Sequence, residues 1–483
     1  VIELYLGLPV SQESLQRLRY SIKLILSQDG KPFSSVYIPP QDITAGAVQI
    51  VVRPSTVGEL RVEGAQYFSE ASYLSRLQLK ADGQIDPKTI RTGIDRMNQN
   101  SFRSAAVRVE KGEAPGTTDV VLQVRERQPY RVFAGYNNTG SLSTTEDRMF
   151  VGFTLGNVFG RAHQMTMQAT SDLDIEHSKS VSGNYTMDLP YNHTATFFGA
   201  YSEIVSLPSG GFDQAGTSWQ LGLNYQIPLP PIGQAYSHRV NLGLDYKSSD
   251  NNLELNLAPF IIPIYDNLTH VAQLRAQYQG SLTDRFGSTS FAAKLTYSPG
   301  NLGSKNEDDA FGQSRAFATA DYIYTNLELS RSTHFTGIMD GWTWLLRGEL
   351  QLSDSNLLSS EQFSAGGSNS VRGYEESEVV GDNAYFISQE LQLPIIPTKL
   401  RLPGYERDGA LRLFVFEDYA KTWNTDKLSG EEGFYLHSVG AGLRYQVAQD
   451  LTFNLSHGWQ LRGSGSSSTG DNYRSHVSIQ FSY

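Results

Sequence analysis

The chain has 483 residues, no cysteine and a formal net charge of -11. The absence of cysteine excludes disulfides, thiolate metal sites and a cysteine nucleophile, and the acidic balance argues against nucleic acid as a main partner. Only 39% of the residues are hydrophobic, yet 26 tyrosines, 23 phenylalanines and 5 tryptophans make 11% of the chain aromatic, which is typical of barrel walls where every second residue meets lipid.

The sequence contains no run of about 18 apolar residues, so a membrane-spanning helix is excluded. A closed barrel is the other structure that pairs every backbone group inside a membrane. The opening segment Val1–Leu6 is too short for a signal peptide, which we expect to have been removed.

Up to about Arg127 the sequence mixes helical and strand periods. In Gln12–Leu26 apolar residues recur at helical spacing behind Ser11, which we take as the N-cap. We expect this helix to bury one face on a small sheet. Ser34–Ile38 and Ala47–Val52 are the predicted strands of that first α/β unit.

A second unit follows with a predicted β-α-α-β-β order. Its first strand is Gly58–Glu63, Ser69 is predicted to cap a short helix, and Asp86-Pro87 places a capping residue ahead of proline at the first helical position. Ala105–Glu110 and Asp119–Arg125 are predicted to close the unit as a hairpin.

From Tyr130 onward about sixteen segments of roughly ten residues alternate apolar with small or polar residues, the pattern of a β-barrel. In Val240–Lys247, for example, the residues with large apolar side chains all fall on one face. Connections alternate between short ones such as Ala448–Asp450 and long ones, for which we take Ser248–Thr269. Short periplasmic turns and long outer loops are typical of bacterial outer-membrane barrels.

The predicted long loop Ser248–Thr269 contains an apolar stretch, Ala258–Tyr265. We expect this stretch to tuck into the lumen or against a neighbouring loop. Contact with a cargo or a surface is the alternative.

Three pieces of the sequence resemble one known family: Val36–Gln41 with Gly58–Gly64, then Pro115–Asp119, and above all Val371-Arg372-Gly373-Tyr374. Over essentially its whole length the chain resembles the outer-membrane transporters of two-partner secretion systems, the TpsB family of the BamA superfamily. The resemblance implies two small α/β polypeptide-transport-associated (POTRA) domains, residues 1–54 (N-terminally incomplete) and 55–128. A transmembrane β-barrel of 16 antiparallel strands, residues 129–483 with an inward-folded loop at 355–383, is expected to follow.

The sequence departs from the family pattern in two places. A plug helix and a linker often come first in this family and do not precede Val1, so we expect either that they were removed or that the pore is gated otherwise. The superfamily motif Phe-x-Asp-x-Gly corresponds to Phe416–Ala420, with Ala420 in place of glycine. We expect this difference to alter the local packing, whereas the acid of the motif, Asp418, is kept. The terminal Phe481 and Tyr483 resemble the signal by which such barrels are recognised for assembly.

Arg372 in the predicted inward loop raises a physical problem, because a guanidinium carried into a lumen loses hydration and needs a carboxylate. In the strand predicted over Ala410–Trp423, Glu417 shares the lipid-facing or interfacial side with Leu411 and Leu413, whereas Asp418 shares the lumen face with Phe416. We therefore predict that Arg372 pairs with Asp418 and that Phe416 packs beside them; an exposed loop arginine is the alternative. The resemblance implies the same contact, with Arg372 holding the loop against the inner wall.

No pattern supports catalysis. The nine histidines do not have the His-Glu-x-x-His spacing, and phosphate-binding and nucleophile-elbow motifs are missing. Glu307-Asp308-Asp309 is typical of a solvated acidic loop rather than a calcium site. We predict no enzymatic activity, no cofactor and no metal.

The resemblance implies a protein translocator whose partner is a secreted, TpsA-like exoprotein. POTRA domains in the periplasm would capture the unfolded cargo, for which the edge of a POTRA sheet is one candidate site and a purely structural edge the alternative. The barrel would pass the cargo to the cell surface without nucleotide hydrolysis, driven by folding outside. Outer-membrane lipid, lipopolysaccharide and the barrel-assembly machinery are further expected partners. A membrane-insertion factor of the same superfamily and a passive porin are the alternatives.

Overall fold

A computed structural model describes residues 2–7, 9–44, 46–80, 83–114, 116–207, 212–233, 235–257, 260–402, 404–464 and 472–483. The chain divides into two compact units, residues 1–130 with 155–164, and residues 131–154 with 165–483. The boundary lies close to the one predicted after residue 128, but the short segment 155–164 belongs to the first unit. No helix among the described residues is long and apolar enough to cross a membrane.

The first unit opens with the 3-10 helix η1 (Ile2–Tyr5) and the helix α1 (Gln12–Gln28), which Ser11 caps by accepting a hydrogen bond from the Ser14 N–H at 3.1 Å. Leu18 is buried, whereas Ile25 on the predicted apolar face is 36% exposed, so the expected burial is only partial. Strands β1 (Ser35–Tyr37) and β2 (Val51–Arg53) pair antiparallel and are shorter than predicted. The two prolines that follow β1 have no N–H group to donate, so β1 cannot continue its ladder. Among the described residues β2 pairs only with β1, so it is short as well.

The rest of the first unit has the predicted β-α-α-β-β order. Its sheet has the order β3-β5-β4, in which β3 and β5 are parallel and β4 is antiparallel to β5. Ser69 and Asp86 cap the two helices, and Asp86 accepts hydrogen bonds from the N–H groups of Lys88 and Thr89. The elements are β3 (Thr56–Glu63), α2 (Glu70–Leu77), α3 (Pro87–Asn98), β4 (Arg103–Lys111) and β5 (Thr117–Glu126).

The core of this α/β unit lies between the two helices and the sheet. Glu126 at the end of β5 orders the chain before α2, because its carboxylate accepts hydrogen bonds from the Gln66 N–H at 2.8 Å and the Tyr73 hydroxyl at 2.6 Å. The main buried apolar residues are Phe68, Tyr73, Leu77, Met97, Phe102, Ala105, Leu122 and Val124.

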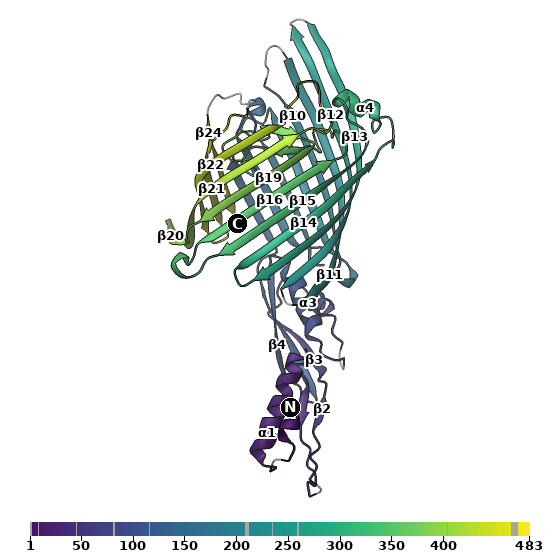
Figure 1. Cartoon of the computed structure of the whole chain (residues 1–483), viewed down its shortest axis with the longest axis vertical. Helices are drawn as coiled ribbons and strands as arrows, with labels where there is room; N and C mark the ends of the chain where they lie inside the picture. Colours follow the sequence, from purple (N-terminus) through teal and green to yellow (C-terminus); the bar gives the residue numbers. More distant parts are fainter. Residues whose placement is uncertain are drawn as a thin grey trace. The chain divides into compact units, whose positions relative to one another are not determined.

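The second unit contains a closed antiparallel barrel of 16 strands, as predicted (Figure 1). Strands β19 and β20 are two segments of one barrel strand, since both pair with β21 and Pro394 between them has no N–H to continue the ladder. The strands are β6 (Tyr130–Asn137), β7 (Arg148–Val158), β8 (His163–Ser171), β9 (Ser178–Asp188), β10 (Thr194–Val205), β11 (Phe212–Ile232), β12 (Tyr236–Leu257), β13 (Phe260–Asp284), β14 (Gly287–Pro299), β15 (Asp321–His334), β16 (Thr343–Ser353), β19 (Asn383–Gln392), β20 (Ile396–Leu402), β21 (Tyr405–Trp423), β22 (Phe434–Val447), β23 (Leu451–Gln460) and β24 (Tyr473–Ser482).

The barrel closes where β24 pairs with β6, from Ser478 opposite Asn137 to Ser482 opposite Phe133. The terminal Tyr483 extends this pairing, because its N–H donates to the Val132 carbonyl at 2.8 Å and its own carbonyl accepts from the Val132 N–H at 3.0 Å. Its side chain is 88% exposed.

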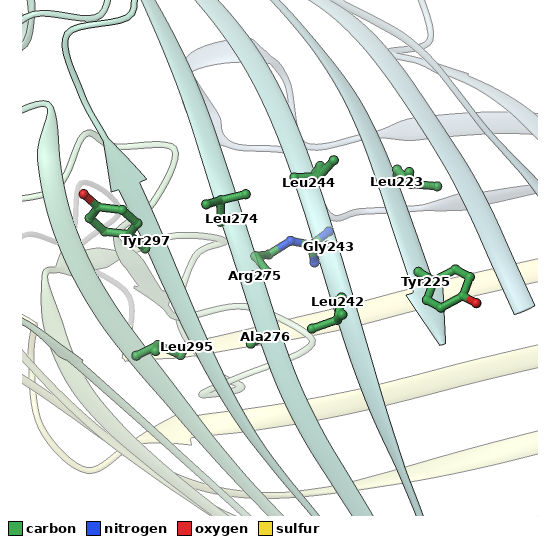
Figure 2. Close-up of a pocket in the computed structure, with 10 residues that line it drawn as sticks. All are labelled: Leu223, Tyr225, Leu242, Gly243, Leu244, Leu274, Arg275, Ala276, Leu295 and Tyr297. Atoms are coloured by element: carbon green, nitrogen blue, oxygen red, sulfur yellow. The ribbon is translucent and has the colours of Figure 1, made fainter. Parts of the chain in front are cut away.

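The two faces of the barrel wall differ in chemistry, as the alternation predicts. Leu242 and Leu244 are 46% and 52% exposed on the outside, whereas Asn241 and Asp245, which flank them in the sequence, are buried on the inside. Figure 2 shows the outer face of β11 to β14, where leucines and tyrosines surround a shallow recess of about 440 Å³. Arg275, also drawn there, belongs to the inner face, where it pairs with Asp245.

Most connections at the end of the barrel where the chain enters β6 are short, such as Ala448–Asp450, and most at the other end are longer, such as residues 300–320 between β14 and β15. The prediction of a long loop at Ser248–Thr269 is wrong, because β12 and β13 continue through it, paired from Ser248 opposite His270 to Leu257 opposite Phe260. Its polar run resembles turn chemistry, but a paired hairpin beyond the wall satisfies its own backbone and leaves polar side chains in water. The side chains of residues 254–265, and so the expected docking of Ala258–Tyr265, lie outside the described residues.

The acidic triplet Glu307-Asp308-Asp309 opens a short helix, α4 (Asp308–Ser314), in the connection between β14 and β15. Asp308 accepts a hydrogen bond from the Ala320 N–H at 2.8 Å, so one of the three acids has a structural partner. Within the described ranges no group of three or more histidines, aspartates and glutamates is placed to hold a metal ion.

Candidate functional site

Residues 354–382 connect β16 to β19 and fold back inside the barrel; we call them the inward loop. The prediction placed this loop at 355–383, but Asn383 is already the first residue of β19. Within the loop, β17 (Phe363–Ala365) pairs with β18 (Val379–Gly381), and residues 366–378 form the tip of this ribbon. The tip carries the Val371–Tyr374 motif.

Arg372 at the tip is 7% exposed and contacts the inner wall through several hydrogen bonds. Its Nε donates to one carboxylate oxygen of Asp418 at 2.7 Å and its Nη2 to the other at 2.9 Å, while its backbone N–H donates to Asp418 at 3.1 Å. The structure thus brings together the two residues that sequence parity paired. This fork geometry is the one that suits a guanidinium and a carboxylate.

A second acid, Glu390 on β19, also faces Arg372. Arg372 Nη1 donates to Glu390 at 2.8 Å, and Arg444 on β22 donates to the same carboxylate at 3.0 Å. Ser388 completes the wall by donating to Asp418 at 2.6 Å. Two guanidinium groups and two carboxylates therefore form one charge-balanced cluster, in which Arg372, Asp418 and Glu390 are buried and the Arg444 side chain is 40% exposed. The pairing offsets much of the cost of removing the buried charges from water.

Aromatic rings on β21 support the guanidinium. The Cζ of Arg372 lies 3.5 Å from the centre of the Phe416 ring, a cation–π contact that adds to the ion pairs. The neighbour of Phe416 on β22 is Gly440, where a Cβ atom would meet the ring at 2.3 Å. The small residue on one strand thus sets the ring position on the next.

Gly373 and Tyr374 seat the tip against β22 and β23. Gly373 has a φ of +93°, and a Cβ on it would meet the backbone of Gly458 at 2.9 Å, so two glycines permit this close approach. The Tyr374 hydroxyl donates to the His437 carbonyl at 2.9 Å and accepts from the His437 N–H at 3.1 Å. Gln460 donates to the Gly373 carbonyl at 2.8 Å.

An apolar cluster surrounds the motif on the side away from Arg372. Val371 and Tyr374 are fully buried in it, and so is Ala420, the residue that replaces the superfamily glycine. The extra methyl group of Ala420 fills space between the loop and the wall. The cluster consists of Ala365, Val371, Tyr374, Val379, Phe386, Ala420 and Leu436.

The base of the inward loop is held by two further ion pairs. Glu361 accepts hydrogen bonds from Lys247 on β12 at 2.7 Å and from Gln273 on β13 at 2.6 Å, and its side chain is 1% exposed. Asp382, at the other end of the loop, is fully buried and pairs with Arg315 from the connection after β14, with one contact at 3.0 Å. The loop is therefore anchored at its tip and at both ends.

The tip also contacts β24, the strand that closes the barrel. Arg474 lies 3.2 Å from Glu375 in the tip and 2.8 Å from Glu146 in the connection after β6. The Gly373 N–H donates to the buried His476 at 3.3 Å. The inward loop thus contacts the last strand at the seam, and Arg474 links it to the connection that follows the first strand.

Sequence reasoning missed several of these contacts. Glu390 falls on the lumen parity of its strand, a signal that was readable, but its register against Arg372 depends on barrel pairing. Glu361, Asp382 and Gly458 carry no motif, and their partners lie far away in the chain. Glu417, assigned to the outer face, does lie there, bonded to His437 at 2.9 Å and to Gln389 at 2.7 Å.

Phe481, proposed with Tyr483 as an assembly signal, is 56% exposed on the outer face of β24. Both residues therefore lie on the outside near the seam, away from the cluster around Arg372.

Two family models match the chain. That of the haemolysin secretion/activation protein ShlB/FhaC/HecB matches residues 116–445, and that of the ShlB-type POTRA domain matches residues 1–55. The first covers more than half of the chain.

Individual relatives agree with these matches. The outer membrane transporter CdiB-2 of Burkholderia pseudomallei is 20% identical over 433 residues, which are 88% of this chain and 70% of that protein. The heme/hemopexin transporter protein HuxB of Haemophilus influenzae is 21% identical over 476 residues, 94% of this chain and 79% of that protein. The solved structure of CdiB from Escherichia coli has the same fold, with a TM-score of 0.80, 17% identity, and coverage of 100% of this chain and 86% of that one.

These matches agree with a closed barrel preceded in sequence by POTRA domains. The chain belongs to the ShlB/FhaC/HecB family of haemolysin secretion/activation proteins and is an outer-membrane transporter of the two-partner secretion (TpsB) type, with its POTRA domains in the periplasm.

Proposed function

We propose that this transporter moves an unfolded, TpsA-like exoprotein through the barrel lumen along a path that the inward loop organises. The observation that carries the proposal is the charge-balanced cluster of Arg372 with Asp418 and Glu390, which holds the tip of the loop on the inner wall. In this mechanism Val371, Gly373 and Tyr374 seat the tip, and Phe416 supports the guanidinium.

The chemistry of the lumen suits passage of a polypeptide. Inward residues such as Asn241, Asp245 and Gln273 are polar, so an extended chain can exchange hydrogen bonds with the wall without adhering to apolar surface. The loop lies in that space, and its three anchors are ion pairs. When the loop leaves the wall, the charged groups of these anchors can be hydrated by water or can bind polar groups of the cargo.

The POTRA domains, residues 1–54 and 55–128, supply the capture step in this proposal. In the sheet β3-β5-β4 the central strand is β5, so β3 and β4 form its two edges. An extended cargo segment can add as a further strand to such an edge through main-chain hydrogen bonds. This mode of capture needs no particular cargo sequence.

We further propose that transport involves no catalytic step, no cofactor and no nucleotide. Folding of the cargo outside the cell supplies the free energy. Phe481 and Tyr483 serve recognition by the barrel-assembly machinery, and lipid and lipopolysaccharide surround the barrel.

The proposal is tested by expressing the full-length protein with the cargo encoded beside it and measuring extracellular cargo. Arg372→Ala is compared with the native chain and with Arg239→Ala, which removes an exposed arginine at the short-turn end whose guanidinium donates to Gln279. Barrel folding is matched by the heat-dependent shift on gels. Cargo in the medium with the native chain and Arg239→Ala, and strongly reduced with Arg372→Ala, is the expected result.

Two outcomes contradict parts of this proposal. Equal release by Arg372→Ala removes the loop cluster from the mechanism. Cargo retained in the outer membrane with every variant supports the insertion-factor alternative instead.

A further inference from the structure

Two cations lie over one aromatic ring on the outside of the barrel. The Lys421 Nζ lies 4.7 Å from the centre of the Tyr435 ring, and the Arg462 Cζ lies 4.9 Å from the same centre. Lys421 and Tyr435 are paired residues of β21 and β22. Among the residues that the structure describes, neither cation is within ion-pair distance of a carboxylate, unlike Arg372 and Arg444 inside the barrel.

Strand parity puts Lys421 and Tyr435 on the outer face, and Arg462, in the connection after β23, reaches the same Tyr435 ring. Asp418 and Ala420 on β21 are fully buried on the lumen side, whereas Val415 is 49% exposed on the other side. Lys421 shares the parity of Val415. Its cross-strand partner Tyr435 therefore also points outward, toward the lipid.

The position along the strand indicates the depth in the membrane. On the outer face of β21 the side chains change from apolar at Val415, through Glu417 paired with His437 at 2.9 Å, to aromatic at Tyr419 and Trp423. Trp423 is the last residue before a long connection. The ring of Tyr419 stacks on that of Tyr385, with 5.7 Å between the ring centres, and Trp459 on β23 is 49% exposed. Aromatic belts of this kind mark a membrane interface, and long connections face the cell exterior. The two cations are therefore at the headgroup level of the outer leaflet.

We infer that Lys421 and Arg462 bind a phosphate group of lipopolysaccharide on the outer face of β21 and β22. A phosphomonoester carries about -1.5 to -2 charges at neutral pH, which matches two cations over one ring better than the single charge of a phospholipid diester. Tyr435 holds both cations in position by cation–π contacts, so little side-chain freedom is lost on binding. The site depends only on the outer-membrane location and not on the path of the cargo.

The test measures lipid binding to the purified full chain by native mass spectrometry. The probes are lipid A with its phosphates, the same lipid A after enzymatic dephosphorylation, and phosphatidylglycerol. Lys421→Gln/Arg462→Gln is expected to bind phosphorylated lipid A about tenfold more weakly than the native chain, since two charge-assisted contacts are lost. Binding of dephosphorylated lipid A should be weak and equal for both proteins.

A matched control is Lys399→Gln/Arg401→Gln at the short-turn end, where both cations already face Glu406. This control is expected to bind like the native chain. The charge-retaining variant Lys421→Arg/Arg462→Lys guards against misfolding and should keep most of the affinity. Unchanged binding by the glutamine variant overturns the site, and equal tightness for phosphatidylglycerol overturns the assignment to lipopolysaccharide.

Discussion

The tip and the base of the inward loop are anchored with opposite signs of charge. At the tip the loop supplies the cation, Arg372, and the wall supplies the acids Asp418 and Glu390. At the base the loop supplies the acids Glu361 and Asp382, and the cations are supplied by residues outside the loop. The partners of Arg372 at the tip lie on the neighbouring strands β19 and β21. The partners of the two acids at the base are Lys247 on β12 and Arg315 in the connection after β14.

This difference indicates where the loop is held most strongly. The tip cluster has four charged groups with multiple hydrogen bonds, and each anchor at the base has one cation. A segment of this kind should leave the wall first at the base and last at the tip. Substitutions at the tip, at the base and outside the loop can test this order of release.

Asp418→Asn should have the strongest effect on the loop. It leaves Arg372 buried with one acid fewer, a loss of about 3 to 5 kcal/mol for breaking a buried pair, so the tip should spend much more time undocked. Because the native chain has no cysteine, Val371→Cys reports docking without background. Val371 is fully buried in the native chain, so the cysteine should be labelled by a thiol reagent only in the Asp418→Asn background.

A cysteine at the exposed Ser364 is the control for this labelling. It should react equally in both backgrounds. Protection of Val371→Cys in the presence of Asp418→Asn would show that Glu390 and the apolar cluster suffice to hold the tip.

Glu361→Gln should weaken the attachment of the loop base less than Asp418→Asn weakens that of the tip, by about 1 to 3 kcal/mol. The ion pair with Lys247 is lost, but the new amide oxygen can still accept a hydrogen bond from Gln273. A double-mutant cycle with Lys247→Met, read from thermal unfolding, isolates the ion pair. A coupling energy near zero would mean that solvent already screens Lys247. A coupling energy larger than that between Arg372 and Asp418 would reverse the proposed order of release.

Ala420→Gly restores the superfamily residue and should destabilise this protein slightly. It removes a buried methyl group, about 0.8 kcal/mol, and adds the backbone entropy of glycine in a strand, about 0.5 to 1 kcal/mol. The melting temperature of the purified barrel should fall by a few degrees with unchanged labelling of Val371→Cys. An increase in stability would indicate that the alanine strains the cluster.

Asp86→Ala lies in the POTRA unit and should leave the inward loop unaffected, at a cost of about 1 kcal/mol for the lost helix cap. Partial burial of Asp86 disfavours its charge, but hydrogen bonds from the Thr89 hydroxyl and from the N–H groups of Lys88 and Thr89 outweigh this and hold its pKa below 3.8. Because the folded pKa is depressed, the ionised cap stabilises fully above about pH 3.8 and its contribution is lost as the pH falls through the lower folded value.

The stability difference between the native chain and Asp86→Ala, measured by denaturant unfolding, should therefore be constant near neutral pH and should shrink in acid. A difference that grows on acidification would contradict the assignment of the cap.

Local patterns were enough to predict much of this molecule. The two-residue alternation predicted the barrel and the inner face of Asp418, since each residue on a strand faces opposite to its neighbours. Capping residues predicted the starts of α1, α2 and α3 for the same local reason. The extension of β12 and β13 was missed, because a polar hairpin in water has the composition of a loop.

Residues close together in the chain specify the barrel wall, the order of the POTRA elements, the lumen side of Asp418 and the motif that meets it, so these features could be predicted from the sequence. Three contacts became visible only in the folded chain: Glu390 joins Arg372, Glu361 reaches Lys247, and Gly373 lies against Gly458. These contacts depend on strand register around a closed barrel and on the path of the inward loop, and no local pattern in the sequence encodes either.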